Sequence, residues 1–379
     1  MKTIEKVLIV GGGIGGQSAG IALRQIGIEV EIAEILPKFD VYGVGIIQQA
    51  NALRALDALG VADEALRRGS PYPKVKMCTA TGHQIAEAGT DPIGRFPSHN
   101  GISRRVLHDI LLERSIELGV KYRLGLTVDS ITDKEDGVDV VFSDGTAGSY
   151  DLLIGGDGIN SKVRNLIFGE SKPNYVGLSN WRYAFKRPKD LDTGYIYFGK
   201  KSKLGIIPMT EDSCYVFVVS AEGADNPFIK EDQMIQKLQS YMKEYPIPMI
   251  QGLIDQVVDP KLVNYRPLET LNLPAPWYKG NVIIIGDAAH ATIPQLGSGA
   301  ALAIEDAVVL AEEIKKQDGA QAIFSRFMKR RYDRCKMVVE SSEKLGVWEL
   351  MEFSGQKLPD DANIGATMGK TTGMLAQPI

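Results

Sequence analysis

A glycine-rich segment near the N-terminus has the residue types and spacing of a dinucleotide-binding turn. Gly11, Gly13 and Gly16 satisfy the pattern Gly-x-Gly-x-x-Gly directly after the apolar run Val7–Val10. The first glycine permits a tight turn, the second lets the backbone approach a pyrophosphate, and the third allows close contact between helix and strand. Glu34 follows about 20 residues later, where a carboxylate can accept hydrogen bonds from ribose hydroxyls. The acid disfavours a 2′-phosphate, so the pattern predicts FAD or NAD rather than NADP.

Two later segments place an aspartate after a buried strand and favour FAD over NAD. Asp157 follows the strand expected at Asp151–Gly155, and Asp287 follows the strand expected at Val282–Ile285. An aspartate at the end of a strand can bind a sugar-like hydroxyl, here that of a ribityl chain. The turn Gly297–Ala300 opens a long helix whose N–H groups can stabilise negative charge on a flavin ring. Either segment alone has a simpler interpretation as a turn and a helix start, but the ordered set predicts FAD.

These ordered motifs resemble those of the FAD-dependent aromatic hydroxylases, single-component flavoprotein monooxygenases similar to para-hydroxybenzoate hydroxylase. The resemblance runs from about Lys6 to Arg334 and includes Gly43–Ile46 and Arg104–Leu107. It implies an enzyme that uses NAD(P)H as a transient reductant and O₂ to hydroxylate a small aromatic or heteroaromatic compound, such as a phenol, hydroxypyridine or purine. In such enzymes the oxygen is transferred from a C4a-hydroperoxide of the reduced flavin.

The resemblance also assigns roles to residues. The ADP half of noncovalent FAD is expected at the glycine turn and Glu34, the adenine near Leu126, and the flavin or ribityl phosphate near Arg104. Asp157 is expected to support both FAD and the transient nicotinamide nucleotide, and Asp287 the ribityl or pyrophosphate portion. The full expected cofactor set is Gly11, Gly13, Ile14, Gly15, Gly16, Glu34, Gly45, Arg104, Leu126, Asp157, Asp287, Gly297, Ser298, Gly299 and Ala300.

The sequence departs from the family pattern at two places. Relatives commonly have glutamine where this chain has Ser298, which keeps a hydrogen-bonding group but has a shorter reach. Relatives also often place an arginine before the Gly-x-Gly-Ile segment, where this chain has Lys38, Phe39, Asp40 and Tyr42. The second departure concerns contacts to the reductant.

Candidate substrate residues lie in the inserted part of the chain that the nucleotide motifs do not use. Tyr215 alternates with apolar residues in Cys214–Val219, so its phenol can face the flavin and orient or deprotonate a ring hydroxyl. Its reference pKa near 10 favours orientation over proton abstraction. Arg182, Tyr183 and Lys203 are expected to orient an anionic or hydroxylated ring. For each of these residues, ordinary packing in a sheet or a solvated charge is the simpler alternative.

The hydrophobic periodicity predicts an α/β fold with a Rossmann-like FAD-binding domain, an inserted and mainly antiparallel substrate sheet, and a C-terminal helical segment. The expected division is 1–72, 98–172 and 265–318 for FAD binding, 73–97 and 173–264 for substrate, and 319–379 for the helical segment and tail. Helices are predicted at Gly15–Gly27, Ala50–Leu59, Arg104–Leu118, Glu231–Glu244, Ser298–Lys315 and Ala320–Phe353. Strands are predicted at Val7–Val10, Val30–Glu34, Asp151–Gly155, Tyr195–Phe198, Leu204–Pro208, Cys214–Val219 and Val282–Ile285. The last ~25 residues are rich in glycine and polar residues and are predicted to be irregular.

Composition limits the partners. The chain has 379 residues, and its 43 Lys and Arg against 47 Asp and Glu give a net charge of −4, which offers no bulk attraction for nucleic acid or an anionic membrane. No apolar run approaches the ~18 residues that span a bilayer, and the absence of a targeting signal makes the cytoplasm the expected location. Cysteine and histidine spacing implies no metal, and His290 is expected to be structural. The basic run Lys329–Arg331 with Arg334 is expected to be a solvated helix face.

Other functions remain open at this point. Flavin-dependent halogenation or prenyl-chain reduction would keep FAD, but halogenases of this fold usually carry Trp-x-Trp-x-Ile, and here Trp181, Trp277 and Trp348 are scattered. A non-enzymatic prenyl-GTPase carrier is disfavoured by the intact nucleotide motifs. An ordinary NAD dehydrogenase is disfavoured by the separate Asp157 and Asp287 motifs. The sequence leaves the aromatic substrate, NADH against NADPH, and the oligomeric state undecided.

Overall fold

A parallel sheet of apolar strands forms the centre of the first structural unit in the computed structural model, which describes residues 3–39, 43–223 and 228–379. Its strand order is β18-β19-β12-β1-β2-β8, and only the edge strand β18 is antiparallel to its neighbour. The strands are β18 (Tyr278–Lys279), β19 (Val282–Ile284), β12 (Leu152–Gly155), β1 (Lys6–Val10), β2 (Glu29–Glu34) and β8 (Lys121–Leu124). Apart from Lys6 at the start of β1, the residues of β1, β12 and β19 are apolar or glycine and are buried on both faces, as parallel strands require.

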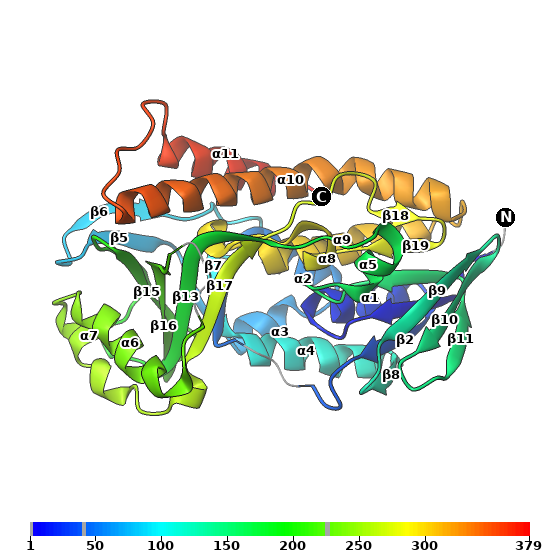
Figure 1. Cartoon of the computed structure of the whole chain (residues 1–379), viewed down its shortest axis with the longest axis horizontal. Coiled ribbons are helices and arrows are strands. Elements are labelled where there is room, and N and C mark those ends of the chain that lie inside the picture. Colours follow the sequence, from blue (N-terminus) through cyan, green and yellow to red (C-terminus); the bar gives the residue numbers. More distant parts are fainter. Residues whose placement is uncertain (1–2, 40–42, 224–227) are drawn as a thin grey trace.

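Helices and a small antiparallel sheet cover this parallel sheet. Helix α1 (Ile14–Gln25) packs against both α4 (Arg104–Glu117) and α9 (Gly299–Ile314), and α9 is buried along most of its length. The sheet β9 (Val128–Lys134), β10 (Gly137–Phe142) and β11 (Ala147–Tyr150) contacts β1 and β12 and adds its apolar residues to the same core. Because β1, β12 and β19 are parallel neighbours (Figure 1), the glycine turn and the two aspartates that follow these strands lie at one edge of the sheet.

A seven-stranded sheet forms the second unit, with the order β17-β13-β16-β15-β14-β5-β6. Its strands are β17 (Asn264–Thr270), β13 (Asn174–Lys186), β16 (Ser213–Ala221), β15 (Ser202–Pro208), β14 (Gly194–Phe198), β5 (Val75–Thr79) and β6 (Gln84–Ala88). All neighbours are antiparallel except the pair β14 and β5. The expected domain boundary at residue 265 therefore falls in a strand of this sheet, and the division of the chain into domains stays a prediction.

Only one face of the seven-stranded sheet is covered by its own helices. Alternate side chains such as Trp181, Tyr183 and Val216 pack with α6 (Glu231–Lys243) and α7 (Pro248–Gln251) in a separate core. The turns η1 (Ile254–Gln256) and η2 (Pro260–Leu262) adjoin α6. The other face is turned toward the FAD-binding side of the molecule (Figure 1). This face is where a substrate can lie between the two units.

A third sheet joins the two units. Its order is β3-β7-β4, from β3 (Gly45–Gln49), β7 (His99–Ser103) and β4 (Ser70–Tyr72), and β7 contacts β15 of the large sheet. Helices α2 (Ala50–Ala58) and α3 (Ala62–Arg67) connect β3 to β4. The remaining short elements near the site are α5 (Lys162–Phe168), α8 (Asp287–His290) and η3 (Pro294–Leu296).

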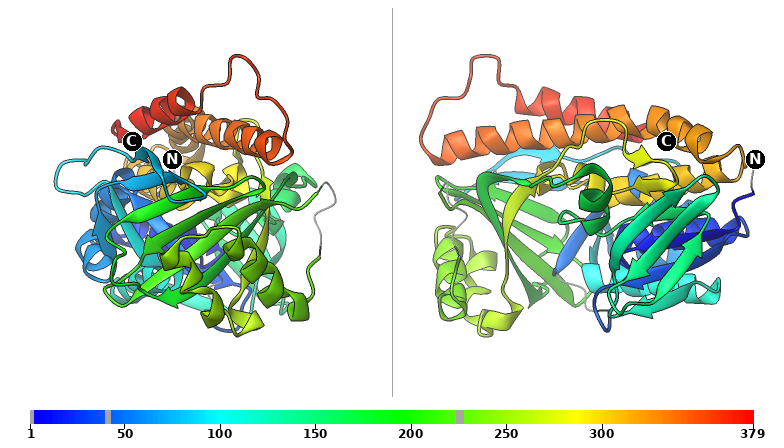
Figure 2. Two further views of the ribbon diagram at one scale, coloured as in Figure 1. Left: turned by 90° about the vertical axis from the view of Figure 1, so that its left-hand side faces the viewer. Right: turned by 45° about the vertical axis from the view of Figure 1, so that its right-hand side comes forward.

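Two C-terminal helices run along the outside of both units. Helix α10 (Ala320–Phe353) contacts α9 at one end and β13 and β16 toward the other, and α11 (Ile364–Ala376) lies back along it (Figure 2). The predicted irregular tail was therefore wrong, because Asn363 caps a helix whose Thr371 and Leu375 are buried. The expected solvated face was wrong for two of its arginines, since Arg331 and Arg334 are buried. Among the described residues, no helix is long and apolar enough to cross a membrane.

Candidate active site

The glycine turn has the geometry that its three key positions require. Gly11 adopts φ +102°, and a Cβ there would lie 2.5 Å from the carbonyl oxygen of Gly156. A Cβ on Gly16 would lie 1.9 Å from the carbonyl oxygen of Gly11, so larger residues are excluded at both positions. A Cβ on Gly13 would meet nothing within 4 Å, which leaves open space beside the start of α1. A phosphate group fits this space next to the N–H groups of a helix N-terminus.

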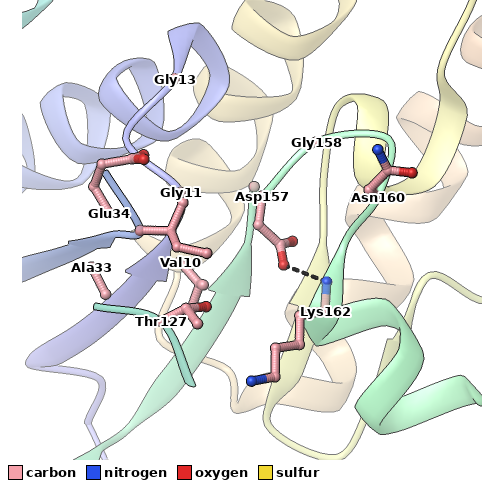
Figure 3. A pocket seen from close by; sticks show the side chains of 12 residues that line it. Val10, Gly11, Gly13, Ala33, Glu34, Thr127, Asp157, Gly158, Asn160 and Lys162 are labelled. Carbon is pink, nitrogen blue, oxygen red and sulfur yellow. Dashed lines mark hydrogen bonds between the residues drawn. The ribbon is translucent and has the colours of Figure 1, made fainter. Parts of the chain in front are cut away.

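A cavity of about 330 Å³ opens beside this turn (Figure 3). Its lining residues are Val10, Gly11, Gly13, Ala33, Glu34, Ile35, Thr127, Gly156, Asp157, Gly158, Asn160 and Lys162. The Glu34 carboxylate accepts hydrogen bonds from the backbone N–H groups of Gly12 (2.7 Å) and Leu36 (3.0 Å). The backbone of Leu126 donates to the carbonyl of Glu34, and its neighbour Thr127 reaches the cavity. The open cradle and the acid at its edge fit the adenosine half of FAD.

Asp157 caps the start of α5 with its carboxylate. It accepts hydrogen bonds from the backbone N–H groups of Lys162 (2.7 Å) and Val163 (3.0 Å) and from the Ser161 hydroxyl. Figure 3 shows the first of these bonds at the border of the cavity. Burial raises the pKa of Asp157, although these donors oppose the shift. Asp157 therefore shapes the wall of the cavity through a helix start, and direct contact with a cofactor stays a prediction.

The start of α9 forms the opposite end of the expected FAD site. Gly297 has the left-handed φ of +63°, and the first helical bond runs from the N–H of Leu302 to the carbonyl of Ser298. The preceding N–H groups at the helix start, including those of Gly299 and Ala300, are available to an anionic or carbonyl group. The Ser298 hydroxyl is buried and donates to the Gln49 side chain (3.2 Å) and the Leu296 carbonyl (2.9 Å). Ser298 therefore holds β3 to the turn, and a backbone N–H is the group it can offer to flavin.

Arg104 and Asp287 face the space between these two ends. Asp287 follows Gly286, whose φ of +58° turns the chain out of β19, and the Asp287 side chain is open to this space. Burial among protein groups raises the pKa of Asp287, while the charge of Arg104 lowers it. The Arg104 guanidinium forms no hydrogen bond or ion pair with any residue that the structure describes. Burial lowers the pKa of Arg104, which Asp287 partly offsets. The pair can hold the ribityl chain and its phosphate.

Tyr215 and Arg182 lie on the uncovered face of the seven-stranded sheet. In the register of β13 and β16, Arg182 is opposite Phe217 and Ala184 is opposite Tyr215, which places all four side chains on one face. Burial raises the pKa of Tyr215 to about 12, with Arg182 opposing the shift. Burial lowers the pKa of Arg182, and the charges of Arg104 and Arg266 lower it further. Arg182 makes no side-chain hydrogen bond or ion pair within the described parts of the chain, so its donors are available to a ligand.

The structure does not bring Tyr183 and Lys203 to this point. Tyr183 packs on the opposite face of the sheet, with its ring 5.0 Å from that of Phe185 in the core under α6. Lys203 lies on the active face, but its ammonium group is paired with Glu349 of α10. Arg182 and Tyr215 thus remain the candidates of the sheet. The positions Asp40 to Tyr42, where the reductant contact was in question, lie outside the described residues.

Two neighbours of Tyr215 were not predicted for the substrate site. The Tyr72 hydroxyl is buried and has no hydrogen-bond partner among the residues that the structure describes. Tyr215 raises the pKa of Tyr72 further than burial alone does. Gly45 lies against the Tyr215 ring, since a Cβ there would be 2.0 Å from Tyr215 Cδ1. Both residues come from β3 and β4, which meet the large sheet only in the folded chain. The sequence pattern Gly43–Ile46 indicated that Gly45 lies at a functional site. The three residues of β4 are too few to form a pattern that could have indicated Tyr72.

Comparison with known proteins agrees with the cofactor that this geometry fits. The family described as FAD binding domain matches residues 5–342, so the chain belongs to that family and binds FAD. YetM of Bacillus subtilis (strain 168), assigned as an FAD-dependent monooxygenase, is 32% identical over 90% of this chain and 93% of its own. The aurachin C monooxygenase/isomerase of Stigmatella aurantiaca is 31% identical over 91% and 90% of the two chains. Within the family, the chain is an FAD-dependent monooxygenase.

A solved structure has the same fold over the whole chain. HpxO of Klebsiella pneumoniae, complexed with FAD and uric acid, superposes with a TM-score of 0.84 at 24% identity and covers 99% of this chain and 97% of its own. This likeness confirms the expected arrangement of a Rossmann-like unit, a separate sheet and C-terminal helices.

Proposed function

We propose that this protein uses NAD(P)H and O₂ to hydroxylate a small, anionic aromatic or heteroaromatic compound. One observation carries the proposal: Arg182 and Tyr215 of the sheet lie near Arg104 and Asp287 of the FAD-binding unit. Arg182 lowers the pKa of Tyr215, and Arg104 lowers the pKa of both Arg182 and Asp287. Arg182 is partly buried, and a cation removed from water without a protein partner is costly, so a ligand that supplies negative charge stabilises it. An aromatic carboxylate or a deprotonated ring such as urate has this charge.

Arg182 binds and orients the ring in this proposal. Its planar guanidinium can donate two parallel hydrogen bonds to a carboxylate or to an oxo group and its neighbouring ring nitrogen. Because Arg182 lies in a long strand paired on both sides, its backbone is held in place by β16 and β17. This support fixes which edge of the ring points toward the flavin.

Tyr215 acts as a hydrogen-bond donor rather than as a base. A phenol whose pKa is raised to about 12 keeps its proton at neutral pH. Its hydroxyl can therefore donate to an oxygen on the ring and stabilise the electron-rich form that is attacked. Bound FAD, once reduced, supplies activation of O₂, and the protein supplies position and a dry environment.

The apolar surroundings of Tyr215 exclude water. Tyr72, Val75, Ile207 and Met209 are all buried in one cluster with the Tyr215 ring. Such a lining keeps a reactive oxygen species from being lost to solvent. The same cluster offers apolar contact to a flat aromatic ring, and Arg182 and the two phenols supply polar groups beside it.

The reductant must bind only transiently in this proposal. The sequence has one Gly-x-Gly-x-x-Gly turn after a strand, and FAD occupies it, so NAD(P)H has no dinucleotide fold of its own. Substrate binding is then expected to speed flavin reduction, which prevents reduction without a ring to hydroxylate.

Substrate-dependent oxidation of NAD(P)H tests the proposal. The purified FAD-loaded protein is mixed with urate, hydroxylated pyridine carboxylates and hydroxybenzoates, each beside a neutral analogue without the acidic group. We expect the anionic member of at least one pair to stimulate NAD(P)H oxidation and to gain one oxygen atom by mass. Rapid NAD(P)H oxidation without any ring compound would indicate a simple reductase. A halogenated or hydrogenated product would indicate one of the other reactions of this fold.

A further inference from the structure

A buried carboxylate behind the active site holds the turn that precedes Asp287. Asp306 of α9 accepts a hydrogen bond from the backbone N–H of Gly286 (2.9 Å), and the same oxygen lies 2.7 Å from His290 Nε2. Gly286 has φ +58° and ψ −142°, a conformation that glycine adopts readily and other residues rarely do, and the bond to Asp306 holds its N–H in this turn. Asp306 is fully buried. It acts on the site through its hydrogen bond to the turn, and its charge also raises the pKa of Asp287.

A run of ion pairs leads from Asp306 through the first half of α10 to the end of α11. Arg331 donates from Nε to Asp306 and from a terminal nitrogen to Glu305, each at 2.7 Å. Arg334 then donates to both oxygens of Glu305 at 2.8 Å. The ion-paired side chains of Arg331, Glu305 and Asp306 are all fully buried. Arg331 and Arg334 are the arginines that the sequence analysis expected on a solvated helix face.

The run ends on the backbone of the C-terminal segment. Arg334 donates to the carbonyl oxygens of Met374 and Leu375, each at 2.8 Å, and Arg54 of α2 donates to the carbonyl of Ala376 at 2.9 Å. These carbonyls are the last ones of α11, where helical bonding leaves acceptors free and the helix dipole is negative. The carboxylate of Glu305 is the counter-charge of Arg334, and the end of α11 accepts the remaining hydrogen bonds of its guanidinium.

The cluster is held by arginine rather than arranged for a metal ion. His290, Asp306 and Cys335 bring ligand atoms within 4.8 Å of one another. Arg331, however, lies between them, with a terminal nitrogen 3.5 Å from Cys335 Sγ and Nε on Asp306. The guanidinium thus occupies the place of a cation. Because buried charges are stable only when each has a partner, removing one end of the run leaves an uncompensated charge inside.

We propose that the docked end of α11 is part of the FAD site, because it completes the ionic run that fixes Gly286 and thereby Asp287. Figure 1 shows α11 on the outer side of α10, away from the parallel sheet, so no direct contact with the cofactor is needed. The inference rests on the proposed role of the Gly286–Asp287 turn in holding FAD. Asp306, Arg331 and Arg334 are then positioning residues. FAD binding and docking of α11 strengthen each other by the same factor, as linkage requires.

Paired substitutions in α10 test the first half of the proposal. Arg334→Met cuts the run, whereas Arg326→Met removes an arginine of the same helix that pairs with Glu313 and Asp318 and contacts neither Asp306 nor α11. Equilibrium binding of FAD to the folded apoprotein is measured by quenching of flavin fluorescence, and circular dichroism verifies folding. We expect Arg334→Met to raise the Kd for FAD by roughly 3- to 30-fold and Arg326→Met to change it less than about two-fold.

A conservative variant keeps this test decisive. Arg334→Lys retains the charge and loses the forked contact, so it is expected to give an intermediate Kd and to replace Arg334→Met if that variant does not fold. Equal Kd values for wild type and the Arg334 variants would overturn the proposal. An equal loss in the Arg326 variant would also overturn it, since the effect would then be general destabilisation of the α9–α10 packing.

Hydrogen exchange tests the reciprocal half. Amides of residues 364–376 are followed in the apoprotein and in the FAD-loaded protein, with amides of α6 as the control because α6 lies in the other unit. We expect FAD to slow exchange in α11 in wild type and to do so less in Arg334→Met. Exchange in α11 that ignores FAD would overturn the proposal. Both measurements report FAD binding and not hydroxylation. The coupling of α11 to FAD can therefore be found even if no aromatic compound is hydroxylated. Hydroxylation can likewise be found even if this coupling is absent.

Discussion

At the scale of single residues, the alternation of side chains along β13 decides which candidates reach the site. Arg182 and Tyr183 are neighbours in a strand, so they must point to opposite faces of the sheet. Because side chains alternate between the two faces of a strand, only one of these two residues can face the site. The alternation does not indicate which one does. The structure answers through tertiary packing, with Tyr183 under α6 and Arg182 beside Tyr215. Tyr72 could not be predicted, because its contact with Tyr215 joins segments far apart in the chain.

Tyr215→Phe tests the role of the phenol. The change removes one oxygen, so FAD binding and folding should be retained, while the loss of one hydrogen bond of about 1–3 kcal/mol lowers the rate of hydroxylation roughly 5- to 150-fold. The measurement is product formed per NAD(P)H consumed. Tyr183→Phe is the matched control, because both rings are 4% exposed and lie on opposite faces. An equal loss in both variants would assign Tyr215 to packing alone.

Gly45→Ala tests whether the position of the Tyr215 ring matters. The new methyl group would lie 2.0 Å from Tyr215 Cδ1, so the ring must move, at a cost of about 1–3 kcal/mol in the free energy of unfolding. We expect lower coupling of NAD(P)H oxidation to product, with FAD affinity kept. Gly252→Ala is the control because Gly252 lies at the end of α7 with φ −68°, and a Cβ there would come no closer than 3.4 Å to another atom. A loss of FAD affinity in place of coupling would support the sequence-based assignment of Gly45 to the cofactor instead.

At the scale of elements, periodicity predicted the long helices and the buried strands but missed contacts made late in the chain. The predicted helix at Ala320–Phe353 is confirmed as α10. The four strands predicted for the parallel sheet are confirmed to within one residue, whereas β8 and β18 were not predicted with bounds. Helix α11 was missed because Gly365, Gly369 and Gly373 weaken its intrinsic propensity. Its packing against α10 and the capping bond from Asn363 compensate. The charged pattern of α10 likewise hid Arg331, since burial of an arginine depends on partners from α9.

The pH dependence of unfolding tests the ionic run. Burial alone would raise the pKa of Asp306, but the charges of His290 and Arg331 lower it to about 2. A carboxylate with a depressed pKa stabilises the fold above its unfolded pKa of about 3.9, and this contribution is lost as the pH falls toward 2. We therefore expect the difference in Tm between wild type and Asp306→Asn to be largest above about pH 4 and to shrink below it. Asp318→Asn, at a half-exposed partner of Arg326, should show a small difference at every pH.

At the scale of the whole molecule, the cofactor is expected to join segments from both ends of the FAD-binding unit. The sequence motifs could place Glu34 and Asp287 at strand ends, because parallel strands carry their ligand sites there. They could not show that Glu34 is bonded to the N–H of Gly12 while Asp287 is open beside Arg104. That difference depends on how α4 and the turn after β19 approach each other.

Removing either carboxylate should weaken FAD binding. Glu34→Ala loses a ribose acceptor and the support of Gly12, and Asp287→Ala loses the partner of Arg104, with about 1.5–3 kcal/mol at stake for each charged hydrogen bond. Equilibrium titration of the apoprotein with FAD is the measurement. Glu29→Ala, on the same strand as Glu34 but paired with Lys121 at the surface, is the control. Wild-type affinity in both Glu34→Ala and Asp287→Ala would refute this placement of the cofactor.

Isotope incorporation from ¹⁸O₂ tests the central claim most directly. The FAD-loaded protein is supplied with NAD(P)H, ¹⁸O₂ and the ring compound that most stimulates NAD(P)H oxidation, and the product is analysed by mass spectrometry. The account predicts one ¹⁸O atom in the aromatic product and loss of most of that product in Tyr215→Phe. A product that contains only oxygen from water, or NAD(P)H oxidation that yields hydrogen peroxide with every ring compound tested, would contradict it.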